Sequence, residues 1–295
     1  MRPAIARTRL DLDSVLAAHR ALRSRVALVP TMGALHTGHE ALLRRAAEEA
    51  PVVVASVFVN PTQFGPDEDF DRYPRTLEAD VALMAGLGVD VVFLPEVVEV
   101  YPEGPGAGTI VDPGGLGAVL EGAVRPTHFR GVLTVVAKLL GMVRPDVAVF
   151  GEKDYQQLVL VRRLVRDLAL PVRVVGEPVV REPDGLALSS RNAYLGAGQR
   201  GAALALSQAL AEGRRHADRG ADAVLDAARR RLASSETEVD YVALTDPELG
   251  PPPDAGAARL LVAGRVGGTR LVDNTGLWLG AAVREPAVSS TGQEG

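Results

Sequence analysis

Short apolar runs alternate with amphipathic stretches along the first 177 residues of this 295-residue chain. Uninterrupted apolar runs are typical of parallel strands that are covered on both faces, whereas apolar residues at intervals of three and four indicate helices. The alternation of the two therefore predicts a doubly wound, mostly parallel α/β domain. The expected strands span 26–29, 52–60, 89–94, 146–150 and 172–175, with a short one at 109–111; the expected helices span 14–22, 77–87 and 132–142, with two more from about 38 and from 157 to about 168.

The pattern changes after about residue 176. A hairpin-like passage with polar turns precedes two Ala-rich helices, expected at 200–216 and 221–233, and then three short stretches alternate like antiparallel strands. Such an order predicts a smaller α+β domain after the parallel one. We expect domains at 1–177 and 178–284, followed by a disordered tail at 285–295.

One strand–loop–helix unit, VALVPTMGALHTGHEALLRR at residues 26–45, stands out for its chemistry. Pro30 is expected to end the strand, Gly33 marks a turn, and a helix begins near Gly38. This geometry aims backbone N–H groups and the positive end of the helix dipole at one point, which favours binding of phosphate there. His36 and His39 lie three residues apart at the helix entry, so their imidazoles can grip phosphate oxygens on one side.

A plainer interpretation makes His36 a loop histidine and His39 a helix-capping histidine, and the glycine-bearing loop around both favours the phosphate site instead. A metal site is less well supported, because no cysteine exists and no third ligand is obvious.

Two further polar clusters also follow predicted strands, at 60–73 and at 151–157. Because the carboxyl ends of parallel strands meet at one edge of a sheet, we expect both clusters to lie beside the histidine loop. Lys153 can neutralise phosphate there, and Asp154 can cap a helix or orient ribose or a metal ion; the alternative is a solvated charged turn. The neutral amides of Asn60, Gln63 and Gln157 suit hydroxyl, amide or carboxylate groups, or else face water.

Acidic and hydroxyl side chains give two more candidates. Asp80, on the helix after the long loop, is a possible Mg²⁺ ligand, or simply an exposed helix carboxylate. Ser189, Ser190 and Arg191 form a compact group of phosphate donors that can close over the nucleotide from the second domain, or merely cap a helix. The remaining loop acids are expected to be solvated charges or caps: Asp67, Glu68, Asp69 and Asp71.

Composition excludes several classes of protein. The net charge of −5 gives no support for nucleic-acid binding. With no cysteine, disulfides, thiolate metal sites and cysteine nucleophiles are excluded, which fits a reducing cytoplasm. No signal peptide or membrane-spanning run is recognisable, and neither a G-x-S-x-G elbow nor a P-loop occurs.

Four separated strings, PTMGALHTGH, FVNPTQFG with DRYPRT, GEKDYQQ and LSSRN, together resemble the signature of the pantothenate synthetase (pantoate–beta-alanine ligase) family. The resemblance covers nearly all of residues 1–280. It implies a Rossmann-like first domain, a smaller C-terminal domain and a cytoplasmic homodimer. It also implies condensation of (R)-pantoate with beta-alanine through pantoyl adenylate, using ATP and Mg²⁺ and releasing AMP and diphosphate.

The same resemblance implies roles for individual residues. His39 takes the position of the family's proton donor, although phosphate binding is the role that its chemistry favours, and His36 and Lys153 act beside it. Pantoate would meet Gln63 and Gln157, beta-alanine would meet Gln63 and Asn60, and magnesium would meet Asp80. The residues expected at ATP are Met32, Gly33, Ala34, Leu35, His36, Thr37, Gly38, His39, Gly151, Glu152, Lys153, Asp154, Val180, Leu188, Ser189, Ser190 and Arg191.

Two rival functions remain open from the sequence. A nucleotidylyltransferase can use the same histidine loop to make a stable nucleotidyl product, although the three amides favour a small polar acid as substrate. A non-catalytic nucleotide-binding or regulatory protein is the other alternative.

Overall fold

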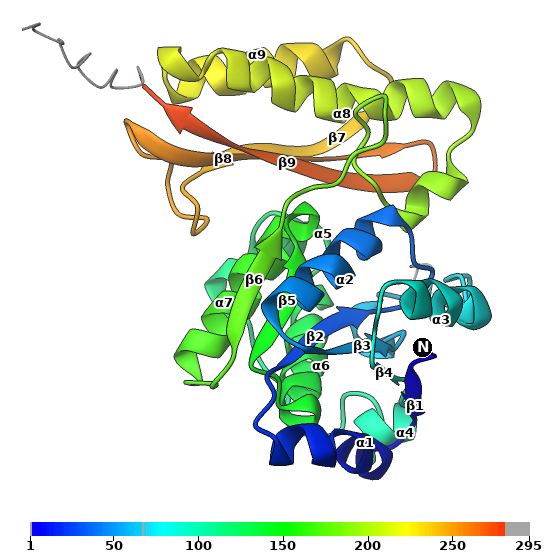
Figure 1. Ribbon diagram of the computed structural model, residues 1–295. Coiled ribbons are helices and arrows are strands. Elements are labelled where there is room, and N and C mark those ends of the chain that lie inside the picture. Colours follow the sequence, from blue (N-terminus) through cyan, green and yellow to red (C-terminus); the bar gives the residue numbers. More distant parts are fainter. Residues whose placement is uncertain (1, 67, 69, 281–295) are drawn as a thin grey trace, which may run out of the picture.

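The structure is a computed structural model that describes residues 2–66, 68 and 70–280; the expected tail at 285–295 lies outside them. A parallel sheet flanked by helices forms the larger part of the molecule, and a smaller antiparallel sheet lies above it, covered by two long helices (Figure 1). The predicted fold class, a doubly wound parallel sheet followed by a smaller α+β part, is therefore confirmed.

The larger sheet has six strands in the order β1-β4-β3-β2-β5-β6, and every pair is parallel. The order reverses between β2 and β5, which creates the crevice where open α/β sheets bind ligands. The histidine loop follows β2 and the GEKD sequence follows β5, so both lie at this switch point. The strands are β1 (Ala4–Ala6), β2 (Val26–Thr31), β3 (Val52–Val57), β4 (Val91–Phe93), β5 (Val147–Gly151) and β6 (Arg173–Glu177).

Side chains that alternate along these strands pack against helices on both faces. Leu28 and Val54 join one core with α1, α6 and α7, whereas Val29 and Val53 join the other with α2 and α3. Burial on both faces explains why the strands are continuous apolar runs. The helices are α1 (Arg9–Ala21), α2 (Thr37–Glu49), α3 (Leu77–Gly86), α4 (Val97–Val100), α5 (Glu121–Val124), α6 (His128–Val143) and α7 (Tyr155–Asp167), with 3-10 turns η1 (Pro61–Gln63), η2 (Gly115–Ala118) and η3 (Glu152–Asp154).

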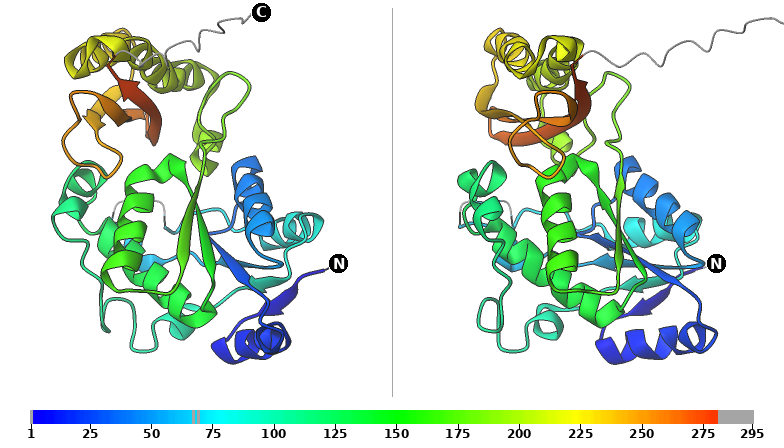
Figure 2. Two further views of the ribbon diagram at one scale, coloured as in Figure 1. Left: turned by 60° about the vertical axis from the view of Figure 1, so that its left-hand side comes forward. Right: turned by 90° about the vertical axis from the view of Figure 1, so that its left-hand side faces the viewer.

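The smaller sheet is antiparallel in the order β7-β8-β9 and is buried on both faces. Leu260 and Val262 pack against α8 and α9, whereas Leu261 between them joins the core of the larger part. Figure 2 shows this sheet lying between its two helices and the parallel sheet. The elements are η4 (Ser190–Tyr194), α8 (Ala197–Arg215), η5 (Ala217–Arg219), α9 (Ala221–Ala233), β7 (Glu238–Thr245), β8 (Gly256–Val266) and β9 (Thr269–Leu279).

Three local predictions were wrong. Helix α1 begins at Arg9 rather than residue 14, because Thr8 and Asp11 form a reciprocal capping box. Pro30 lies inside β2 instead of ending it: β5 pairs with β2 only at Ala27 and Leu28, so no partner on that side requires the missing N–H. Residues 109–111 form no strand.

Ion pairs join the two parts of the chain. Arg270 of β9 binds both carboxylate oxygens of Glu121 at 2.5 and 2.7 Å, and it also binds Asp240 at 2.6 Å. The hydroxyl of Tyr241 donates to Glu121 at 2.8 Å. Because all four side chains are largely shielded from solvent, this network stabilises the contact between the small sheet and α5.

Replacing Glu121 by Gln is expected to lower the free energy of unfolding by about 2 kcal/mol, because the charge-assisted bonds to Arg270 are lost. Chemical denaturation measures the change. Asp167→Asn, which removes a largely exposed pair with Arg166, is the control and is expected to change stability by less than about 0.5 kcal/mol. Equal effects of the two substitutions would contradict this prediction.

Candidate active site

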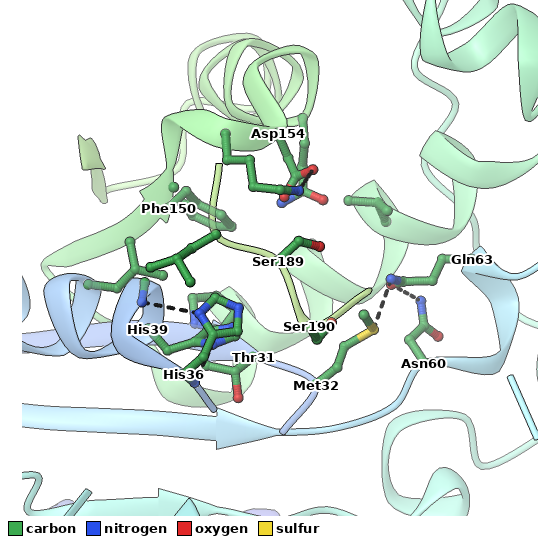
Figure 3. A pocket seen from close by; sticks show the side chains of 18 of the residues that line it. Thr31, Met32, His36, His39, Asn60, Gln63, Phe150, Asp154, Ser189 and Ser190 are labelled. Atoms are coloured by element: carbon green, nitrogen blue, oxygen red, sulfur yellow. Dashed lines mark hydrogen bonds and ion pairs between the residues drawn. The ribbon is translucent and has the colours of Figure 1, made fainter. Parts of the chain in front are cut away.

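A cavity of about 230 Å³ lies over the switch point of the parallel sheet. Figure 3 shows its polar wall, with His36 and His39 from the loop after β2, Asp154 from the turn after β5, and Ser189 and Ser190 from the segment that leads into the smaller part. Asn60 and Gln63, which follow β3, also line the cavity, so the three clusters that the sequence placed after separate strands converge, as predicted.

The histidine loop forms an unusual helix cap. His36 is the N-cap of α2: its Nδ1 accepts from the Gly38 N–H at 3.1 Å, and the Nδ1 of His39 accepts from the His36 N–H at 3.3 Å. The two imidazoles thus replace the hydroxyl and carboxylate of an ordinary capping box. The ring centroids lie 4.2 Å apart. A Cβ at Gly38 would come within 2.8 Å of the His36 ring, so glycine is required there.

These bonds determine which nitrogens carry protons. Burial, and then the nearby Lys153 charge, lowers the pKa of His36; burial, and then His36, lowers the pKa of His39 to about 3. Both rings are therefore neutral near pH 7. Because each Nδ1 accepts a hydrogen bond, each Nε2 carries the hydrogen. The site therefore offers two neutral N–H donors at this position. The two interpretations of the histidines are compatible, because Nδ1 caps the helix while Nε2–H can bind phosphate.

The backbone of the loop is turned away from the expected phosphate site. Gly33 N–H donates to Thr31 Oγ1 at 3.2 Å, and Ala34 and Leu35 donate to the Asp80 carboxylate at 3.0 and 2.8 Å. The prediction that free loop N–H groups would cradle phosphate is wrong for these three residues, because protein groups already accept from them.

Asp80 is buried and hydrogen-bonded to protein groups, whereas a metal ligand would need to be accessible to the ion. It is 3% exposed and also accepts from the Thr76 hydroxyl at 3.1 Å. Its hydrogen bonds hold Ala34, whose φ of 52° lies in the left-handed region that costs a non-glycine residue about 1 kcal/mol or more. This geometry argues against the direct magnesium ligand expected from the sequence and assigns Asp80 to fixing the loop.

Lys153 and Asp154 also belong to the polar wall of the cavity. Lys153 Nζ lies 3.4 Å from Asp154 Oδ1. Burial alone would raise the pKa of the Asp154 carboxyl, but Lys153 and then Arg191 hold it below its usual range. In the part of the chain that the structure describes, Asp154 is the only acidic side chain that lines the cavity. This part of the wall thus contains a lysine ammonium whose positive charge is partly neutralised by the neighbouring carboxylate.

The amide corner of the cavity is fixed by a buried network. Asn60 is 1% exposed; its Nδ2 donates to Gln63 Oε1 at 3.1 Å and to Gly131 O at 3.2 Å, and its Oδ1 accepts from Thr62 and Tyr101. Because Asn60 uses all of its donors, the structure favours an orienting role over the direct beta-alanine contact that was expected. Gln63 Nε2 is left to face the cavity, beside the Met32 sulfur at 3.2 Å.

A second network anchors the backbone of Gln63. The Arg125 guanidinium donates to His128 Nε2 at 3.0 Å, so His128 Nδ1 carries the hydrogen and donates to Gln63 O at 2.9 Å. Arg125 also binds Glu68 at 2.5 and 2.7 Å. Glu68 is thus ion-paired, whereas the sequence predicted a solvated loop charge. Asp71 is exposed, as expected, and Asp67 and Asp69 lie outside the described residues.

The apolar wall of the cavity was missed in the sequence. It is formed mainly by one face of α6. Its signal was the apolar run that follows Gly131, from which only a helix at 132–142 was predicted. The apolar side chains of this wall include Phe58, Val132, Val135, Val136, Leu139 and Phe150.

Most of the predicted site residues face the cavity. Ser189 is both a lining residue and the cap of η4, accepting from the Arg191 N–H at 3.3 Å. Among the expected ATP residues, Gly33, Ala34, Leu35, Thr37 and Glu152 do not line the cavity; Glu152 instead binds Arg259 of the smaller part. The predicted residues that do line it are Met32, His36, Gly38, His39, Asn60, Gln63, Gly151, Lys153, Asp154, Gln157, Val180, Leu188, Ser189, Ser190 and Arg191.

A larger cavity of about 530 Å³ adjoins the first and shares Lys153, Asp154, Ser189 and Arg191 with it. More arginine and lysine side chains than carboxylates line it, so the two spaces together suit an extended polyanion.

Fold and site together are typical of an α/β nucleotide-binding enzyme, with a cavity that two histidines line at the sheet's switch point. Residues 4–276 match the Pantoate-beta-alanine ligase family, so the chain belongs to that family.

Individual relatives agree with this assignment. The chain is 58% identical to the pantothenate synthetase of a Nocardioides species, over 97% of this chain and 88% of that protein. The crystal structure of pantothenate synthetase from Thermus thermophilus superimposes with a TM-score of 0.85 at 51% identity, covering 92% and 98% of the two chains. The enzyme from Francisella tularensis, solved with beta-gamma ATP and beta-alanine, gives 0.76 at 33% identity, covering 92% and 97%.

Replacing Asp80 by Asn is expected to loosen the loop, because an amide nitrogen would face a backbone N–H, and to lower stability by about 1–3 kcal/mol. Activity should fall as well, while the Mg²⁺ concentration for half-maximal rate stays unchanged. Magnesium titrations of the wild type, Asp80→Asn and the exposed control Glu78→Gln distinguish the two roles. A large shift of the half-maximal concentration in Asp80→Asn alone would restore the metal-ligand assignment.

His128 is expected to make stability depend on pH. Burial, and then Arg125, lowers its pKa to about 4, against about 6.5 when unfolded. Between these values the unfolded chain binds the proton and the folded protein does not. The stabilising contribution is therefore complete above about pH 6.5 and is lost as the pH falls toward 4.

Thermal unfolding at several pH values tests this expectation. The melting temperature of His128→Asn should fall less steeply than that of the wild type between pH 6.5 and 4, and His19→Asn on α1 controls for the loss of one imidazole. Parallel curves for the wild type and His128→Asn would refute the assignment.

Proposed function

We propose that the cavity carries out both steps of an ATP-dependent ligation and that its polar wall stabilises the first. As a member of its family, the enzyme condenses pantoate with beta-alanine at the expense of ATP. The observation that supports the site is the convergence of two Nε2–H donors with the Lys153 ammonium over the switch point.

In the first step, an oxygen of the (R)-pantoate carboxylate attacks the α-phosphorus of ATP and the bond to diphosphate breaks, giving pantoyl adenylate. Both reactants are anions, so the site must offset their repulsion. His36 and His39 donate hydrogen bonds to phosphate oxygens, and Lys153, Ser189, Ser190 and Arg191 neutralise the charge that grows on the diphosphate. In this scheme His39 is a neutral hydrogen-bond donor and transfers no proton.

Pantoate fits the mixed character of the other walls. Its hydroxyl and carboxylate groups suit the amides of Gln63 and Gln157, and its branched dimethyl carbon suits the apolar face of α6. Asn60 orients Gln63 from behind. This combination of a fixed amide corner and an apolar wall selects a small branched acid over a second nucleotide, which supports ligation over nucleotidyl transfer.

In the second step, the amine of beta-alanine attacks the acyl carbon, and AMP leaves with the C–O bond electrons. The nitrogen loses a proton to water, because Asp154, the only carboxylate among the described residues that line the cavity, is held in its weakly basic form by Lys153. Positioning of the free amine beside the acyl phosphate therefore supplies most of the acceleration.

Magnesium does not fit a site made by protein side chains alone. Within the described residues no three histidine or carboxylate groups gather, and Asp80 is occupied by the loop. We propose that Mg²⁺ enters on the phosphates of ATP, and no step is assigned to it here.

The assembly and the compartment follow the family expectation. We propose a cytoplasmic homodimer: the dimer follows from family membership, and the absence of cysteine fits a reducing compartment. In the described residues no helix is long and apolar enough to span a membrane.

Removal of the Nε2–H donor alone tests the adenylation site. His39→Asn keeps an acceptor near the position of Nδ1, so the cap survives, and the rate of pantoate-dependent diphosphate release should fall about 10²–10³-fold. Lys153→Ala should cause a loss of similar order. Stopped-flow or coupled assays measure the rates.

The control is His19→Asn, remote from the cavity. Near wild-type rates in both site variants would contradict the site, and a wild type that makes no pantothenate from ATP, pantoate and beta-alanine would contradict the function itself.

A further inference from the structure

Asn274, a residue of β9 that the sequence pattern did not single out, reaches from the smaller part of the chain to the turn that carries Lys153. It is 2% exposed. Its Nδ2 donates to the backbone oxygens of Glu152 and Lys153, both at 2.9 Å, and its Oδ1 accepts from Arg259 Nε at 2.8 Å. Every donor of the Asn274 amide is therefore used to hold the backbone at Lys153.

The turn η3 depends on such support. It spans only Glu152–Asp154, and so short a 3-10 turn makes few backbone hydrogen bonds of its own. Arg259 adds a second restraint: it binds the Glu152 carboxylate at 2.8 Å and lies 3.8 Å over the Tyr155 ring. The residues on both sides of Lys153 are thus fixed from β8 and β9.

The neighbour of Asn274 restrains the facing wall. Asp273, also buried, accepts two hydrogen bonds from Arg181 at 2.6 and 2.9 Å. Arg181 belongs to the segment that contributes Val180 and Ser189 to the cavity. Adjacent residues of one strand therefore connect the two walls between which the phosphates of ATP are expected to lie.

We propose that Asn274 is a positioning residue for adenylation, which sets the Lys153 ammonium against the phosphates without itself touching substrate. The inference rests on the proposed function, because it assumes that Lys153 acts on the departing diphosphate. It follows that docking of the small sheet onto the parallel sheet completes the active site: separated from β9, the Lys153 turn loses the side chain that satisfies its carbonyls.

Two substitutions isolate the hydrogen bonds. Asn274→Asp has the same shape and keeps the acceptor for Arg259, but it turns a carboxylate oxygen toward two carbonyls. Asn274→Ala removes all three bonds. Both should lower kcat for pantoate-dependent diphosphate release about 10–100-fold, since a displacement of about 1 Å has that effect, while the KM for beta-alanine stays unchanged.

Thr275→Ala provides the matched control. Thr275 is the next residue of β9. Among the described residues its hydroxyl bonds only to the nearby Gly276 carbonyl, and it is not among the residues that line either cavity. It is expected to keep wild-type kinetics. Melting curves confirm that each variant is folded, and Asn274→Asp remains informative where Asn274→Ala is too unstable.

A double-mutant cycle with Lys153→Ala decides between positioning and general destabilisation. If Asn274 acts through Lys153, Asn274→Asp should cost less than about 3-fold in the Lys153→Ala background. Rate losses that multiply in the double variant would overturn the inference and leave the proposed function intact. Wild-type enzyme that forms no pantothenate would overturn the proposed function, and the inference would fall with it.

Discussion

The whole site depends on two half-buried imidazoles that stay neutral and that both use Nδ1 to accept a backbone hydrogen bond. A cationic pair 4.2 Å apart would repel itself, and burial would make it more costly. The helix start solves this problem because its own N–H groups bind both Nδ1 atoms. The proton is thereby forced onto each Nε2, and the ring planes are fixed before any substrate arrives. A site built in this way needs no rearrangement when phosphate charge develops, which is what preorganised stabilisation requires.

The same constraint explains the neighbouring sequence. Gly38 leaves room for the His36 ring, and Asp80 holds the strained backbone between the strand and the cap. The N–H groups of Gly33, Ala34 and Leu35 are used for this internal support, so the loop presents side chains rather than backbone to the cavity. In the proposed function, phosphate binding by the loop therefore falls to its histidines, and the backbone around them acts as their scaffold.

Much of this arrangement was accessible from the sequence, for a physical reason. Parallel strands bring their carboxyl ends to one edge, so any polar residue that follows a buried run, such as Lys153 after β5, is expected there. Residues whose role depends on contacts between distant segments were not accessible. Asn274 lies in an ordinary alternating strand, and Asp80 looks like a surface acid until the loop folds over it. The start of α1 was missed because the capping box at Thr8 begins the helix before Ser14. The continuation of β2 through Pro30 was missed because one side of β2 has no hydrogen-bonding partner at that position.

The smaller part of the chain also holds cavity-lining segments of the chain in place. Its sheet packs on both faces: α8 and α9 bury one, and the other lies on the larger part through Leu261 and the polar residues of β9. An apolar contact alone would permit sliding, whereas Asn274, Asp273 and Arg270 have directional partners at short distances. Their placement beside Lys153, Arg181 and Glu121 fixes the sheet in one register over the cavity. The residues of the proposed adenylation site are thus held in place from both sheets.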